Sequence, residues 1–191
     1  MKRTIIGGVV GGVVLFIWGA LTHMVFPLWE KAVLAIPGEE GVVGAMRGAI
    51  REPGVYLFPG ADMSLKLSKE EKDAWAVKLK AGPRGLLVYR PDGAEPMSPQ
   101  QLGSEAASNM LAALLVALAL AGLRGGYVTR VLVSALFGAV AWLSISASYY
   151  IWYGFSREFS HAELIEQVGG WLVVGLVMAA IVKRPSVASK A

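Results

Sequence analysis

Residues 4–29 read TIIGGVVGGVVLFIWGALTHMVFPLW and contain no Asp, Glu, Lys or Arg. A helix that spans a bilayer needs roughly 20 mostly apolar residues. The apolar stretch also exceeds the roughly 7–15 residues of a secretory signal, and no A-x-A cleavage motif follows it. The segment therefore predicts an uncleaved membrane helix near the N-terminus.

Three more windows without charged residues follow along the chain, at 106–123, 131–156 and 167–182. Of the 191 residues, 55% are hydrophobic and 17% are charged, whereas charged residues make up about 25% of ordinary globular domains. The composition therefore predicts an α-helical membrane protein, a bundle of four transmembrane helices. The expected segments are 1–26, 106–124, 131–153 and 164–182, with a cytoplasmic tail at 183–191.

The 79-residue loop at 27–105 contains enough structural signals for a small α+β domain between the first two membrane helices. Helical spacing of apolar residues predicts a helix over 39–50. EPGVYLFPG and GLLVYRPDG predict short strands at 55–58 and 86–89, because each apolar run is bounded by turn residues. A helix is expected between them, over about 69–80. Two strands alone are marginally stable in water, so we expect this domain to pack against the membrane surface or a partner protein.

Three capping-box motifs mark expected helix starts. They are SKEE at 68–71, SPQQ at 98–101 and SHAE at 160–163. The second predicts that the membrane helix at 106–124 begins before its apolar core. The third predicts that the last membrane helix begins at His161, with Ser160 as its cap and Glu163 bonding back to it.

The distribution of charge predicts the orientation in the membrane. Both termini and the 124–130 turn carry basic residues without acids, whereas the 154–166 segment is acidic. The positive-inside rule then places both termini in the cytoplasm and 27–105 outside it, in a bacterial inner membrane. This distribution also accounts for the net charge of +4, so we expect the lipid bilayer as a partner and no nucleic acid.

The first membrane segment carries glycines at small-xxx-small spacing, which lets helix backbones approach closely in lipid. These pairs are Gly7 with Gly11 and Gly8 with Gly12; Ser134 and Gly138 form a similar pair in the third segment. They predict helix packing, either within the chain or against another membrane protein subunit.

The two histidines are the candidate ligands of a cofactor or metal. His23 lies 19 residues after Thr4, or about 28 Å along a helix, and so near the far edge of a hydrocarbon core about 30 Å thick. His161 is expected in the same layer, beside Glu163. His23 and His161 could bind haem or chlorophyll, and with Glu163 a metal ion. The alternative is that His23 marks the membrane boundary and that Glu163 caps its helix, and we therefore predict no cofactor.

Motifs of known enzyme classes are absent from the sequence. It contains no GxSxG, no P-loop and no dinucleotide fingerprint. The absence of cysteine excludes disulfides, thiolate metal sites and cysteine nucleophiles. The sequence does not indicate an enzyme.

Several segments resemble a family of uncharacterised bacterial inner-membrane proteins with four transmembrane helices. They are FIWGALTHMVFPL, EPGVYLFPG, AGPRGLLVYRPDG and EPMSPQQL. The resemblance implies the topology and a bacterial setting, and it implies no activity.

Three functions are compatible with these observations. The first is a non-catalytic accessory or structural subunit of a larger membrane complex, such as a respiratory or photosynthetic one. The second is a membrane enzyme or cofactor-binding protein with a site at the outer membrane face. The third is a lipid or small-ligand binder that uses Tyr56, Trp75 and Tyr89 of the 27–105 domain.

Overall fold

The computed structural model describes residues 1–61 and 66–182; the predicted tail at 183–191 lies outside them. The chain divides into two compact units. The helix bundle consists of Met1–Val33, Pro96–Ser148 and the chain from Ser156 onward. The small unit consists of Leu34–Glu95 with Tyr149–Phe155.

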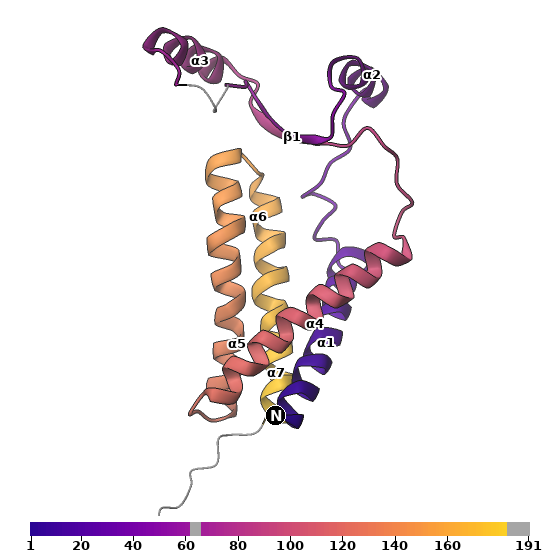
Figure 1. The fold of residues 1–191 in the computed structure, drawn as a ribbon, viewed down its shortest axis with the longest axis vertical. Helices are drawn as coiled ribbons and strands as arrows, with labels where there is room; N and C mark the ends of the chain where they lie inside the picture. Colours follow the sequence, from indigo (N-terminus) through magenta and orange to yellow (C-terminus); the bar gives the residue numbers. More distant parts are fainter. Residues whose placement is uncertain (62–65, 183–191) are drawn as a thin grey trace, which may run out of the picture. The chain divides into compact units, whose positions relative to one another are not determined.

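Four helical segments are long and apolar enough to cross a membrane, as the sequence predicts. The first is α1 (Lys2–Met24) and the second is α4 (Pro99–Gly122) (Figure 1). The third, Tyr127–Tyr153, contains α5 (Tyr127–Ala141) and the π-helical turns η1 (Trp142–Ser146) and η2 (Tyr149–Tyr153). The fourth, Arg157–Ile181, contains α6 (Arg157–Leu164), the π-helical turn η3 (Ile165–Gly169) and α7 (Gly170–Ile181).

The outward faces of these helices are apolar, as lipid contact requires. On α5, for example, Leu132, Leu136 and Val140 are all exposed. A bilayer supplies no hydrogen bonds to such a surface, and these side chains need none. The chain is thus a multi-pass membrane protein by the length and composition of its helices.

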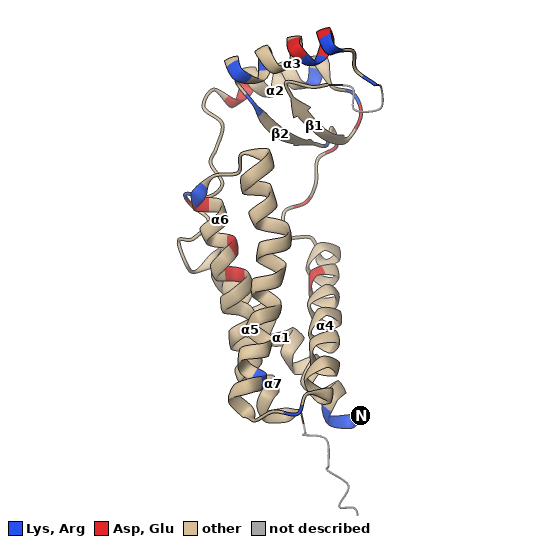
Figure 2. Ribbon diagram, turned by 90° about the vertical axis from the view of Figure 1, so that its left-hand side faces the viewer, with Lys and Arg blue, Asp and Glu red and all other residues tan. Residues whose placement is uncertain are grey.

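Few charged residues lie on the helices of the bundle (Figure 2). The end that carries the N-terminus holds basic residues (Figure 2). Lys2 and Arg3 begin α1, and the buried Arg130 lies in the first turn of α5. Acidic residues lie on α4 and on the fourth segment, away from that end. Both signs occur where the fourth segment begins, because Arg157 and Glu158 are its first residues.

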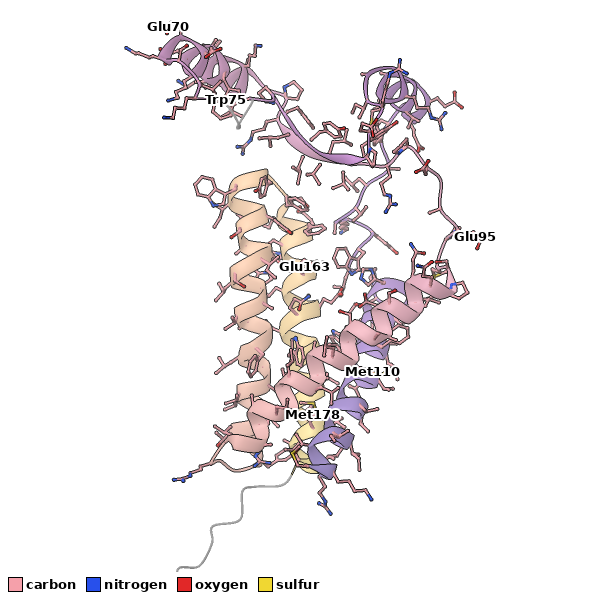
Figure 3. The ribbon with its side chains drawn as sticks, viewed as in Figure 1. Glu70, Trp75, Glu95, Met110, Glu163 and Met178 are labelled. Atoms are coloured by element: carbon pink, nitrogen blue, oxygen red, sulfur yellow. The ribbon has the colours of Figure 1, made fainter. Side chains whose placement is uncertain are left out.

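Glycines of α1 allow two other helices to approach it closely. A Cβ atom on Gly8 would lie 2.8 Å from the Cα atom of Leu114, and one on Gly12 would meet the backbone of Met110, both on α4. A Cβ atom on Gly7 would lie 2.7 Å from Val182, and one on Gly11 would meet Met178 of α7. Figure 3 labels Met110 and Met178 on the two helices that contact α1. These four glycines are therefore used within the chain, which leaves no glycine face of this group for another subunit.

Ser134 and Gly138 have the same role between α5 and the fourth segment. The Ser134 hydroxyl is fully buried and donates a hydrogen bond of 2.7 Å to the main-chain oxygen of Trp171. A Cβ atom on Gly138 would meet the main-chain oxygen of Gln167. Small side chains thus bring α5 against η3 and α7.

Arg130 holds together the ends of two helices. Its guanidinium group is buried and donates to the main-chain oxygens of Val182, just after α7, and of Leu123, just after α4. Carbonyl groups at a helix C-terminus have no partner within the helix and carry partial negative charge. A buried arginine is therefore a suitable donor here.

Two of the three expected capping boxes are present. The side chains of Ser98 and Ser68 accept hydrogen bonds from the main-chain N–H groups of Gln101 and Glu71. The side chains of Gln101 and Glu71 in turn accept hydrogen bonds from the main-chain N–H groups of Ser98 and Ser68. The third prediction is wrong, because the last helical segment begins at Arg157 with Ser156 as its cap. Glu163 is consequently not a capping residue.

The small unit contains the expected two-stranded sheet and two helices. Strands β1 (Gly54–Phe58) and β2 (Gly85–Tyr89) pair antiparallel, with Val55 opposite Val88. The helices are α2 (Glu39–Ala49) and α3 (Lys69–Ala81), and neither has a buried residue. The Trp75 indole of α3 donates to the main-chain oxygen of Pro59 at 3.0 Å, which fixes α3 next to the end of β1.

Candidate functional site

The carboxylate of Glu166 is the meeting point of several side chains of the bundle. Glu166 belongs to η3, and π-helical turns occur frequently at functional sites. Its Oε2 atom accepts a hydrogen bond of 3.2 Å from the Thr22 hydroxyl, which is fully buried, and lies 3.2 Å from Nε2 of His23. Its main-chain oxygen accepts a bond of 3.2 Å from the Trp18 indole. Three residues of α1 therefore converge on one residue of the fourth segment.

Aromatic rings support the imidazole of His23 from one side. The chain turns after α1, and Trp29 stacks on His23 with ring centroids 4.6 Å apart and planes 9° apart. Phe159 of α6 contacts Trp29 edge-on at 5.4 Å. The indole N–H of Trp29 is buried near the Glu166 carboxylate without reaching hydrogen-bond geometry. This packing holds His23 in place against Glu166.

A cavity of about 350 Å³ opens beside the pair, between α1, α4 and η3. Its polar lining comes from His23, Glu105, Asn109 and Glu166. The rest of its wall is apolar and includes Phe16, Met24, Met97 and Leu102. A smaller cavity of about 100 Å³ shares Glu105, Asn109 and Glu166 with it and adds Trp18 and Gln167. A few convergent polar groups in an apolar cavity are typical of small-molecule sites.

The two polar residues of α4 are already paired with each other. The Asn109 amide donates a hydrogen bond of 3.0 Å to Oε1 of Glu105, four residues earlier on the same helix. Both side chains are four residues apart and so lie on one face of α4. Glu105 thus lines the cavity and accepts a hydrogen bond from a neutral amide.

Glu163 takes part in a separate contact, one helical turn before Glu166. It accepts a hydrogen bond of 3.0 Å from the Ser146 hydroxyl of η1, and Figure 3 shows it on α6. Nearby, the Trp142 indole donates to the main-chain oxygen of Ser160 at 2.9 Å. These bonds connect the third and fourth segments. Glu163 and Ser146 are not among the residues that line the cavity.

The structure gives the predicted ligands different neighbours from those expected. His23 pairs with Glu166, Glu163 bonds to Ser146, and His161 is exposed in the second turn of α6. Among residues 1–61 and 66–182, no three His, Asp or Glu side chains are gathered closely enough to hold a metal ion. A metal or cofactor site at His23, His161 and Glu163 stays a prediction.

Sequence reasoning missed Thr22, Glu105 and Asn109 as parts of this site. A signal was available for the last two, because a carboxylate and an amide four residues apart precede the apolar core of α4. Spacing within one helix, however, does not identify the helix opposite. Nothing in the sequence marked Thr22 as a site residue, because hydroxyl groups in membrane helices usually bond to their own backbone. The Thr22 hydroxyl indeed also donates to the main-chain oxygen of Gly19 at 2.9 Å.

Comparison of the chain with protein-family models, with curated proteins and with solved structures finds no match. The resemblance drawn from the sequence segments therefore rests on those segments alone.

Proposed function

We propose that this multi-pass membrane protein binds a small amphiphilic molecule in the cavity between α1, α4 and η3. The observation that carries the proposal is the convergence of Glu105, Asn109, Glu166 and His23 on one cavity with otherwise apolar walls. The proposal develops the small-ligand function expected from the sequence, but it moves the site from the small unit to the bundle.

The position of Glu166 supports binding over a purely structural role. An ionisable residue within a membrane segment is costly and is by default a candidate for function. Glu166 keeps 22% of its side chain exposed, and His23 keeps 51%. A residue that only joined two helices would account for the bonds to Thr22 and Trp18. It would not account for a second carboxylate, Glu105 of α4, in the lining of the same cavity.

Filling the cavity tests this proposal. Gly19 lines the cavity, and a Cβ atom there would meet nothing within 4 Å. Gly19→Leu is therefore expected to occupy the cavity without disturbing the helices around it. Gly103→Leu is the matched control, because Gly103 of α4 has equally open surroundings and does not line the cavity.

The measurement is mass spectrometry of small molecules that co-purify with each variant from membranes. We expect a species retained by the wild-type protein and by Gly103→Leu, and reduced at least about tenfold in Gly19→Leu, since the side chain takes the space of the ligand. The same profile from all three proteins would contradict the proposal.

The accessory-subunit function remains a second candidate, and the surface of the small unit favours it. Val55 and Val88 are 65% and 70% exposed, and they are cross-strand partners. An exposed apolar pair on a two-stranded sheet gains stability when a partner covers it.

Replacing this apolar pair by lysines tests the second candidate. We expect the wild-type protein, solubilised mildly from native membranes, to run as a complex larger than one chain. Val55→Lys with Val88→Lys should release the monomer, whereas Val77→Lys on α3, at a site 67% exposed, should not. Size-exclusion chromatography with light scattering distinguishes the outcomes, and a wild-type monomer would remove this candidate.

A further inference from the structure

We propose that the ligand of the cavity between α1, α4 and η3 is a protonated amine that carries an apolar chain. This inference rests on the proposed function, because it names the chemical class that the same cavity would take.

The charge of the lining favours a cation. Glu105 and Glu166 both line the cavity, and its one basic lining residue is His23, whose Nε2 atom lies 3.2 Å from Oε2 of Glu166. Glu105 accepts a hydrogen bond from the neutral amide of Asn109. An anionic headgroup would be repelled by both carboxylates, whereas a cation would be attracted by both.

The hydrogen-bonding groups match an ammonium in number and kind. An alkylammonium has three donors and no acceptor. One carboxylate oxygen of Glu105 and one of Glu166 already accept bonds from Asn109 and Thr22, which leaves the second oxygen of each for a ligand. The amide oxygen of Asn109 remains a further acceptor while its nitrogen donates to Glu105. Charge-assisted bonds of this kind are about twice as strong as bonds between neutral groups.

The apolar part of the wall accounts for the chain of the ligand. Phe16, Met24, Met97 and Leu102 line the same cavity, and methionine side chains adapt to irregular ligand shapes. A volume of about 350 Å³ lies near the lower limit of small-molecule sites, about 300–1,000 Å³. The cavity therefore fits a headgroup and a short chain, and it is too small for a phospholipid with two acyl chains. A bare divalent ion would make no contact with most of this apolar wall.

Three probes of equal chain length and different charge test the inference. Octylamine, octanol and octanoate are titrated against the full chain in phosphatidylcholine nanodiscs by equilibrium dialysis, with empty nanodiscs as the blank. We expect saturable binding of octylamine, at least about tenfold tighter than that of octanol, with octanoate the weakest, because only the amine forms charge-assisted bonds to both carboxylates.

Isosteric variants connect this preference to the two carboxylates. Glu105→Gln and Glu166→Gln should each weaken octylamine binding about tenfold and leave octanol binding unchanged. Glu163→Gln is the control, since it removes the same charge one turn from Glu166 and outside the cavity. Circular dichroism of each variant verifies that the bundle is folded.

Each other outcome identifies which claim fails. If octanol or octanoate binds as tightly as octylamine and Gly19→Leu abolishes that binding, the cavity is a site but its ligand is not an amine. Octylamine binding that survives both Glu→Gln variants also overturns the inference. If no probe shows saturable binding that depends on Gly19, the inference and the proposed function both fail.

Discussion

Replacing Gly12 by alanine is expected to destabilise the bundle by about 1–3 kcal/mol, the usual cost of forcing extra atoms into a packed interior. The new methyl group would meet the Cα, N and Cγ atoms of Met110 on α4. Two of these atoms belong to the backbone and cannot rotate away, so α1 and α4 must move apart. Thermal or denaturant unfolding in detergent micelles, followed by circular dichroism, measures the loss.

Gly19→Ala in the same helix is the control for this effect. A Cβ atom at Gly19 has nothing within 4 Å, so the substitution adds no contact. Alanine in a helix interior is about 0.5–1 kcal/mol more favourable than glycine. Gly19→Ala should therefore be neutral or slightly stabilising. Equal stability of the two variants would show that α1 and α4 do not pack through Gly12.

Replacing Arg130 by methionine is expected to cost about 1.5–3 kcal/mol, the range for buried hydrogen bonds to a charged group. Methionine keeps an unbranched apolar stem but removes the donors to the main-chain oxygens of Val182 and Leu123. The ends of α7 and α4 then lose a shared partner. The same unfolding assay measures the effect.

Arg124→Met provides the matched comparison, because Arg124 lies in the short connection between α4 and α5, close to Arg130 in sequence, and is exposed. Exposed substitutions usually change stability by no more than about 0.5 kcal/mol. If Arg124→Met were as damaging as Arg130→Met, the effect would come from loss of positive charge at this end and not from the hydrogen bonds.

Local features of the fold were predictable from the sequence, because they depend on neighbouring residues. The four apolar segments and the caps at Ser68 and Ser98 are of this kind. The cap at Ser160 was predicted wrongly because Ser156, four residues earlier, offers the same side chain, and its hydroxyl accepts the bond from Phe159 N–H. A capping motif alone does not decide between two serines one turn apart.

The site was predictable only in part, since it depends on which helices are neighbours. The position of His23 along its helix was calculated from helix rise. The sequence also predicted an acidic residue of the last segment, Glu163, in the same layer. The choice of Glu166 over Glu163 depends on the helical phase through η3, where the turn is π-helical. Likewise, the glycine spacing of α1 predicted close packing, whereas the assignment of Gly8 and Gly12 to α4 required the three-dimensional arrangement.

The contact between His23 and Glu166 is the centre of this account, and solid-state NMR of the protein in lipid bilayers tests it most directly. The chain has only two histidines, so ¹⁵N-histidine signals are assigned with one His161→Ala variant. With ¹³C-labelled glutamate carboxyls, we predict a dipolar coupling from Nε2 of His23 of the size that a 3.2 Å nitrogen–oxygen contact implies, and its loss in Glu166→Ala. No coupling to His23, or a coupling that persists in Glu166→Ala, would contradict the account.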